Sequence, residues 1–292
     1  MSDSALLHHS NPELNRPVMV AAFRGWNDAG DAASFAAEHL QRVWGAVAIA
    51  SIDPETFFDF QDTRPQVELA DGVTRKITWP ANEFSAARLH NSPRDVIVLV
   101  GTEPNLRWKS FAGLVVSVAQ RFGVELVITL GALLADVPHS RPVPVTGTAV
   151  DQELIDRLGL QRSRYEGPTG IVGVLHDSLA LAGISSASLW AAVPHYLAVT
   201  PNPKAALALV HETVRIVGWP AEVDDLERAS AAYETRVSEM VSSDDDVTAY
   251  VKLLEDRTDE RNREALEEME LPSGAALAAE LETFLRNRGH DD

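Results

Sequence analysis

Several polar side chains that could support acid–base chemistry lie in loops that follow apolar segments of strand length. His139 and His195 each follow a Val-Pro dipeptide. An imidazole has an unperturbed pKa of about 6.5, so either histidine could serve as a general acid or base. The carboxylate of Glu103, Glu166 or Asp136 could orient such an imidazole. A histidine after a proline can equally bond to the loop backbone, so a structural role stays open for both.

The two Val-Pro-His segments invite comparison because each ends a predicted strand. Proline restricts the residue before it to an extended conformation, so both strands are expected to stop with nearly the same geometry. Nearby loops carry Arg107 and Arg141, whose guanidinium groups could clamp a carboxylate or a phosphate. A site shared between these loops is one hypothesis.

The loop Gly25-Trp26-Asn27-Asp28-Ala29-Gly30-Asp31 has glycines that permit positive φ and a tryptophan expected to be exposed, so it could cradle a ligand. Asp28 and Asp31 both lie where the following helix begins. A carboxylate there would fill the positive end of the helix dipole and repel an anion. The alternative is a capped helix start with a rigid turn.

A second glycine-rich segment opens another predicted helix. Gly167, Gly170 and Gly173 form a G-x-x-G-x-x-G pattern with Thr169 available for hydrogen bonding. Helix amides at this point could hold an anion, although the P-loop lysine and the G-x-G-x-x-G dinucleotide fingerprint are both missing. Close packing of the helix explains the glycines about as well.

The candidate residues lack the spacing of known catalytic motifs. The sequence contains no H-E-x-x-H, G-x-S-x-G or P-loop pattern and no cysteine, so enzyme activity is permitted but not indicated. No cofactor and no metal site are predicted. The candidate ligand-binding residues are Trp26, Asn27, Asp28, Glu103, Asn105, Arg107, His139, Arg141, Glu166, Thr169 and His195.

An alternation of strands and helices is expected to position these loops. Continuous apolar runs of strand length alternate with amphipathic helical segments, which predicts an α/β fold with a mostly parallel sheet flanked by helices. Asp71-Gly72 predicts a type I′ hairpin over residues 67–79 at the sheet edge. The predicted strands are 17–23, 46–52, 95–100, 125–130 and 186–193, and the predicted helices are 36–44, 108–122, 151–158, 170–182 and 203–217.

The composition divides the chain into three segments. Residues 1–16 are polar and predicted to be flexible, residues 17–220 form the α/β core domain, and residues 221–292 form an acidic helical C-terminal subdomain. The last segment holds 21 of the 43 acidic residues. Three helices are expected in it, with breaks at 242–244 and 272–274 and with Asp244 and Ser273 as N-caps.

Charge and cysteine content limit the possible partners. A net charge of −18 on 292 residues disfavours nucleic acids and anionic membranes, because phosphate groups would be repelled. The apolar runs are far shorter than the roughly 20 residues that cross a bilayer, which predicts a protein that is not embedded in a membrane. The absence of cysteine fits a cytoplasmic location.

Several motifs in one order resemble a known family. The segments FRGWNDAGDAA, GTEPNLRW, GALLADVPHSRPVPVTG, YEGPTGIVGVL and SLWAAVPHYLAVTPNPKA, with Asp59-Phe60 and Arg64-Pro65, are similar to actinobacterial members of the proteasome assembly chaperone 2 (PAC2) family. The resemblance covers roughly Pro17 to Trp219. It implies a nucleoside phosphorylase/hydrolase-like α/β fold and self-association as a homo-oligomer, for which a trimer is one candidate form.

The resemblance leaves two functional hypotheses. Eukaryotic and archaeal relatives help to build the 20S proteasome, which implies a protein-binding or assembly factor with a proteasome-related partner. Relatives that dock on the proteasome end in a hydrophobic residue, a tyrosine and one further residue, whereas this sequence ends Arg288 to Asp292. The alternative is an enzyme or sensor that binds a nucleotide, nucleoside or carboxylate through the loops at the carboxyl edge of the sheet.

Overall fold

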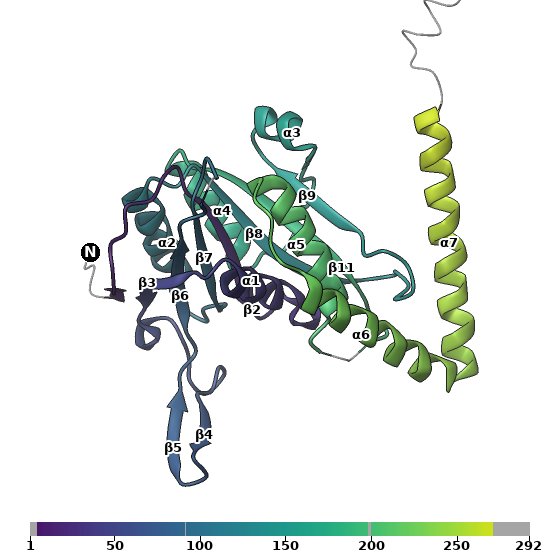
Figure 1. The fold of residues 1–292 in the computed structure, drawn as a ribbon, viewed down its shortest axis with the longest axis horizontal. Coiled ribbons are helices and arrows are strands. Elements are labelled where there is room, and N and C mark those ends of the chain that lie inside the picture. Colours follow the sequence, from purple (N-terminus) through teal and green to yellow (C-terminus); the bar gives the residue numbers. More distant parts are fainter. Residues whose placement is uncertain (1–4, 91, 198–199, 271–292) are drawn as a thin grey trace, which may run out of the picture. The chain divides into compact units, whose positions relative to one another are not determined.

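The computed structural model describes residues 5–90, 92–197 and 200–270 (Figure 1). The chain divides into two compact units, residues 1–239 and residues 240–292. This division lies beyond the change of composition at residue 221, because helix α6 (Asp224–Ser242) starts within the first unit and buries Leu226 in its core.

The first unit is built on a nine-stranded sheet. Its four central strands, β7, β2, β8 and β11, pair in parallel, and antiparallel strands flank them on both sides. The predicted α/β fold is therefore confirmed, with parallel pairing concentrated at the centre. In sheet order the strands are β1 (Leu6–His8), β3 (Val47–Ile52), β6 (Asn82–Ala87), β7 (Val96–Thr102), β2 (Val18–Arg24), β8 (Leu126–Ala135), β11 (Ser185–Pro194), β9 (Val145–Ala149) and β10 (Gln161–Arg162).

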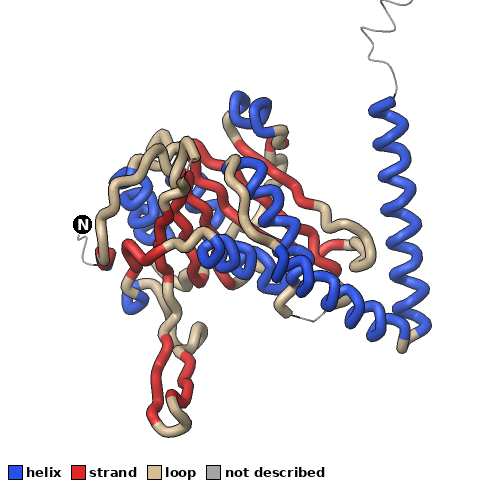
Figure 2. Tube along the Cα trace, in the orientation of Figure 1, coloured by secondary structure: helices blue, strands red, loops and turns tan. Residues whose placement is uncertain are grey.

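Helices cover both faces of this sheet, which explains why β2 is a continuous apolar run (Figure 2). Along β2, Val18, Val20 and Ala22 point into the core beneath helices α1 (Ala32–Val43) and α5 (Pro203–Val217). The alternate residues, including Phe23, point into the core beneath α2 (Trp108–Phe122) and α4 (Ile171–Leu181). A shorter helix, α3 (Gln152–Leu158), follows β9.

Several strands outside the parallel centre of the sheet were not predicted from the sequence. Residues 6–8, which fall in the segment expected to be flexible, form β1 by antiparallel pairing with β3. Strands β6 and β9 were not predicted, because both are short and contain polar residues. The predicted strand 46–52 is present, but β6 and β7 lie between it and β2 in the sheet.

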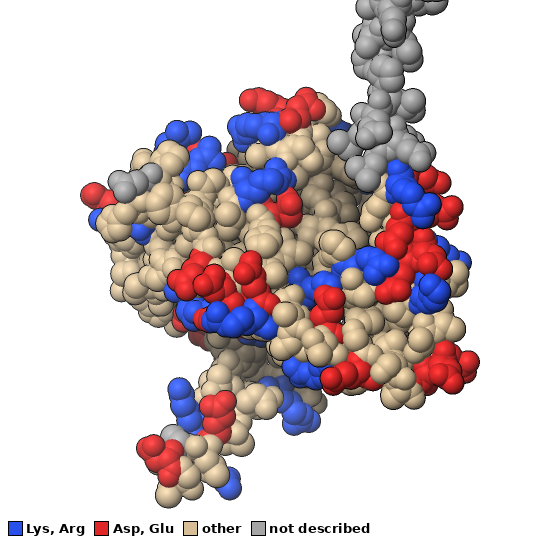
Figure 3. Space-filling view, turned by 45° about the vertical axis from the view of Figure 1, so that its right-hand side comes forward, with Lys and Arg blue, Asp and Glu red and all other residues tan. Residues whose placement is uncertain are grey.

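The predicted hairpin exists as a separate two-stranded sheet instead of decorating the large one. Strands β4 (Gln66–Ala70) and β5 (Thr74–Thr78) pair only with each other among the described strands and extend away from the large sheet (Figure 1). Asp71 and Gly72 both have positive φ, but Ala70 pairs with Thr74, so the connection holds three residues and not the two of the predicted type I′ turn. Acidic and basic side chains both occur on the hairpin, among uncharged residues (Figure 3).

The described part of the C-terminal segment is helical. Helix α7 (Asp245–Glu270) begins after the predicted break, and the Asp244 carboxylate accepts hydrogen bonds from the amides of Asp246 and Val247 at 3.0 and 3.1 Å. Asp244 therefore acts as the predicted N-cap. The third predicted helix and its cap Ser273 lie outside the described residues. No described helix combines the length and the apolar character that a membrane crossing requires.

Candidate functional site

The carboxylate of Glu103 joins three of the candidate loops at the carboxyl ends of β2 and β7. Its Oε1 accepts hydrogen bonds from the Ile171 amide at 2.7 Å and from Asn27 Nδ2 at 3.1 Å. Its Oε2 accepts from the Trp26 amide at 3.3 Å. Glu103, Asn27, Trp26 and the start of α4 form what we term the Glu103 cluster.

The Glu103 carboxylate occupies the N-terminus of α4, which was predicted as a candidate anion site. Because Glu103 already accepts from the Ile171 amide, the chain supplies its own carboxylate to the positive end of α4. A Cβ at Gly170 would lie 2.4 Å from Asn27 Nδ2 and 2.7 Å from Glu103 Oε1. A Cβ at Gly173 would lie 2.0 Å from Thr169 Oγ1. These distances favour close packing as the reason for both glycines.

Replacing Gly170 with alanine should lower the free energy of unfolding by about 2 kcal/mol, because Asn27 and Glu103 must move to admit the methyl group. Gly113→Ala is the control, since Gly113 lies in α2 with nothing within 4 Å of a built Cβ. That variant should gain stability by about 0.5 kcal/mol or more. Urea denaturation of both proteins checks the prediction, and a Gly170→Ala protein as stable as the wild type would contradict it.

Asp28 has a structural role at the start of α1. Its buried carboxylate accepts from the Ala33 amide at 2.7 Å, the Ser34 amide at 3.2 Å and the Ser34 hydroxyl at 2.5 Å. Burial raises the pKa of Asp28, and these hydrogen bonds oppose the rise. The geometry favours the capped helix start over a ligand cradle. Trp26, in the same loop, has 66% of its surface exposed.

Asn105 organises the loop between β3 and the hairpin. Its Oδ1 accepts from the Asp59 amide and the Thr63 hydroxyl, each at 3.0 Å, and its Nδ2 donates to Asp62 Oδ2 at 2.7 Å. The neighbouring Arg107 is exposed and adopts a positive φ of 54° just before α2.

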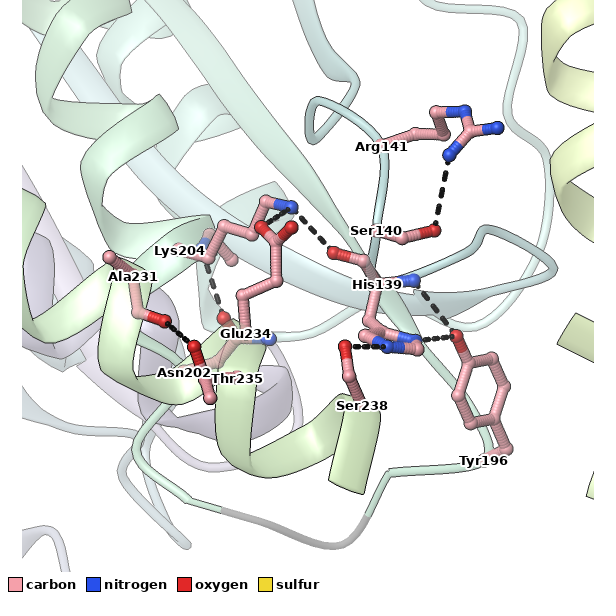
Figure 4. Close-up of polar contacts among 11 residues, drawn as sticks. His139, Ser140, Arg141, Tyr196, Asn202, Lys204, Ala231, Glu234, Thr235 and Ser238 are labelled. Atoms are coloured by element: carbon pink, nitrogen blue, oxygen red, sulfur yellow. Dashed lines mark hydrogen bonds and ion pairs between the residues drawn. The ribbon is translucent and has the colours of Figure 1, made fainter. Parts of the chain in front are cut away.

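A second polar group surrounds the buried His139 (Figure 4). The His139 amide donates to the Tyr196 hydroxyl at 2.8 Å, and the His139 Nδ1 lies 2.9 Å from the same oxygen. The Nε2 lies 3.1 Å from Ser238 Oγ on α6. Both ring nitrogens thus face hydroxyl groups of the chain itself.

Lys204, at the start of α5, links this group to α6 (Figure 4). Its Nζ donates to the His139 carbonyl at 2.5 Å and to Glu234 Oε2 at 2.5 Å. Sequence reasoning did not select Lys204, Glu234, Tyr196 or Ser238. The adjacency of Tyr196 to His195 was the one local signal, whereas the α6 residues carry no motif that relates them to His139.

A cavity of about 10 Å3 lies beside this group, lined by residues that include His139, Lys204, Asn202 and Tyr233. That volume is close to what a single water molecule requires. The Tyr233 hydroxyl is buried and has no hydrogen-bond partner among the described residues. The space is too small for a nucleotide, a nucleoside or a carboxylate metabolite.

The two Val-Pro-His segments do not end their strands in the same way, so the expectation of matched geometry is wrong. Strand β11 is in register with β8 such that Val193 pairs with Leu134 and Pro194 with Ala135. The ladder thus stops before Val137. As a result His139 is buried, whereas 42% of the His195 side chain is exposed and its Nδ1 lies 3.1 Å from Asp136 Oδ1.

The structure nevertheless brings both histidines to one tyrosine. The Tyr196 ring centroid lies 6.0 Å from that of His139 and 5.9 Å from that of His195. The guanidinium of Arg141 lies 3.5 Å from Oγ of Ser140, the preceding residue in the same loop. Glu166 and Thr169 are exposed on the loop before α4 and belong to neither cluster. Within the described residues, no three or more metal-ligating side chains come together.

His176 on α4 is a partly buried polar group that the candidate list does not include. Its Nδ1 lies 2.7 Å from Ser186 Oγ, and its Nε2 lies 2.7 Å from Ser188 Oγ and 2.8 Å from Thr129 Oγ1. Hydroxyl groups can donate or accept, so they satisfy a neutral imidazole. Burial lowers the pKa of His176 to about 4.

These features define an α/β domain whose loop polar groups bond mainly to one another. Residues 22–241 match the model of the PAC2 family. The chain belongs to the PAC2 family.

Solved structures agree with this assignment. A PAC2 family protein from Streptomyces avermitilis is 46% identical, with a TM-score of 0.75 over 80% of this chain and 99% of that one. A proteasome-assembly chaperone homologue from Mycobacterium tuberculosis is 45% identical, with a TM-score of 0.73 and the same coverage. An archaeal proteasome activator from Pyrococcus furiosus, at 20% identity and a TM-score of 0.65 over 80% of this chain and 97% of that one, shares the fold. A search of curated proteins returned no match.

Proposed function

We propose that this protein is a cytoplasmic, self-associating assembly factor that binds proteasome-related proteins. The similarity at 45% identity to the M. tuberculosis proteasome-assembly chaperone homologue, across 99% of that chain, carries the proposal. Glu103, Asp28 and Asn105 accept hydrogen bonds from the chain's own backbone, which leaves these candidate residues with fewer polar atoms for a small-molecule ligand.

The test is affinity capture with proteasome subunits from the same source. We expect the tagged full-length chain to enrich unassembled proteasome subunits, and its deletion to slow assembly of the 20S particle. Capture without any subunit enrichment, together with unchanged assembly in the deletion strain, would overturn the proposal. A tagged, unrelated acidic protein of similar size serves as the control for charge-driven binding.

One observation favours a small-molecule sensor or enzyme as the second candidate. His195 lies 3.1 Å from Asp136 and beside Tyr196, so an exposed imidazole has a carboxylate to orient it. A ligand at 100 times its Kd would add about 2.7 kcal/mol of stability. We expect no nucleotide, nucleoside or carboxylate to raise the Tm of the wild type more than that of a His139→Ala, His195→Ala double variant. A ligand that stabilises the wild type alone would favour the second candidate.

A further inference from the structure

The β4–β5 hairpin has one mainly apolar side that carries a single charge. Val67 lies directly opposite Ile77, and Leu69 lies opposite Arg75. Because side chains alternate along a strand, these four residues and Trp79 share one side, which we term the apolar face. Arg75 is its only charged member. The opposite side, the polar face, carries the pairs Gln66–Thr78 and Glu68–Lys76.

The apolar face is open to solvent although the base of the hairpin is held in place. Its four hydrophobic side chains are exposed by 46% to 62%, and Arg75 is exposed as well. The Trp79 ring packs edge-on against Phe60 with 4.8 Å between centroids, which anchors the hairpin at its base. A two-stranded hairpin is marginally stable alone, and contiguous apolar surface of this kind marks an interaction site.

The charge of Arg75 indicates the chemistry of the surface that covers this face. Within the described part of the chain, the Arg75 guanidinium forms no ion pair. A covering surface would remove water from the guanidinium, and a buried charge without a partner is strongly unfavourable. A carboxylate can accept two parallel hydrogen bonds from a guanidinium and so compensates its charge. The covering surface is therefore expected to be apolar, with an Asp or Glu opposite Arg75.

Two other occupants fit this face less well. A second copy packed face to face would bring two Arg75 guanidinium groups into one apolar contact, where like charges repel each other. An anionic lipid surface would repel Asp71 in the hairpin turn and the chain as a whole, which has a net charge of −18. A protein surface that combines apolar side chains with one carboxylate has neither disadvantage.

We propose that the apolar face of the β4–β5 hairpin binds the proteasome-related partner, and that the partner presents an apolar patch with a carboxylate that pairs with Arg75. The inference rests on the proposed function. It adds the surface of this chain that makes the contact and the chemistry of the partner surface.

Two charge-removing variants at adjacent positions test the role of Arg75. Arg75→Gln changes the apolar face and Lys76→Gln changes the polar face, and both remove one positive charge. We expect Arg75→Gln to bind unassembled proteasome subunits about 30-fold more weakly than the wild type does, and Lys76→Gln to stay within about threefold, because only the first leaves a carboxylate buried without its partner. Equal affinities of the two variants in biolayer interferometry would overturn the proposal.

Charge reversal identifies the partner's carboxylate. Arg75→Glu should bind more weakly still, since it places two carboxylates in one contact. Among single Asp→Lys and Glu→Lys variants on the surface of the subunit that binds, at least one should strengthen binding to Arg75→Glu about tenfold. A complete set without such a variant would overturn the pairing of Arg75 with a carboxylate.

A second matched pair tests the hydrophobic part of the contact. Ile77→Ser and Thr78→Ser lie next to each other on β5 and change opposite faces of the hairpin. Ile77→Ser should weaken subunit binding about tenfold, whereas Thr78→Ser should leave it unchanged. Unchanged thermal unfolding of the α/β core shows that each variant is folded. Equal binding by the two serine variants would contradict the proposal.

The same serine variants identify any other occupant. Self-association of the isolated chain, or its binding to phosphatidylserine vesicles, would overturn the proposal if Ile77→Ser weakened it and Thr78→Ser did not. The first result would assign the face to a second copy, and the second would assign it to a membrane.

The wild type distinguishes failure of this inference from failure of the proposed function. A wild type that binds no proteasome subunit contradicts the proposed function, and this inference fails with it. A wild type that binds as tightly as Arg75→Gln and Ile77→Ser contradicts this inference alone, because the subunits then contact another surface of the chain.

Discussion

Replacement of Glu103 by alanine is expected to lower the free energy of unfolding by about 3 kcal/mol. The substitution leaves the amides of Ile171 and Trp26 and the side-chain amide of Asn27 without their charged acceptor. It also removes the negative charge from the N-terminus of α4. Chemical denaturation of the wild type and the variant measures the difference.

Two further variants distinguish the loss of the Glu103 hydrogen bonds from the loss of one negative charge. Glu103→Gln keeps an acceptor oxygen but loses the charge, so we expect it to retain part of the stability that Glu103→Ala loses. Glu83→Ala removes an exposed carboxylate from β6 and should change stability by less than about 0.5 kcal/mol. If Glu103→Ala were no more destabilising than Glu83→Ala, the loops would not depend on the Glu103 carboxylate.

The second large effect is a loss of stability in acid that depends on His176. The pKa of this imidazole is lowered to about 4 in the folded chain, whereas the unfolded chain takes up the proton at about pH 6.5. The contribution is fully present above about pH 6.5. As the pH falls from there to about 4, the free energy of unfolding should decrease by an amount on the order of 3 kcal/mol.

Denaturation curves between those pH values check the prediction. A His176→Gln variant should lose stability less steeply with falling pH than the wild type, since it has no imidazole to protonate on unfolding. His211→Gln, which removes an exposed histidine from α5, should follow the wild-type slope. A wild-type slope in His176→Gln would show that burial of this imidazole does not contribute to the acid sensitivity.

The core of the fold could be predicted because its helix ends and apolar strands are marked by residues that lie close together in the sequence. Helices α2 and α5 begin and end at the predicted residues, and each stops at a glycine with positive φ, Gly123 or Gly218. The central strands are apolar on both faces and leave few alternatives. By contrast, β1, β6 and β9 form by pairing with strands that are distant in the sequence. Their own residues are therefore not enough to predict them.

The roles of the candidate site residues could be predicted from the sequence less well than the fold. Residue type identified Glu103, Asn27 and His139 as notable, but their roles depend on atoms brought together from distant segments. Glu103 meets the Ile171 amide of α4, and His139 meets Lys204 of α5 and Ser238 of α6. The two Val-Pro-His segments illustrate the converse, because identical tripeptides take different positions once β8 and β11 set their register.

We propose that this PAC2 family protein works by binding proteins of the proteasome. Sedimentation velocity of the purified full-length chain mixed with unassembled proteasome α-subunits tests it most directly. The account predicts a new, faster-sedimenting boundary that contains both proteins and persists at physiological salt, where binding by net charge alone is screened. Separate boundaries for the chain and the subunits at every mixing ratio would contradict it.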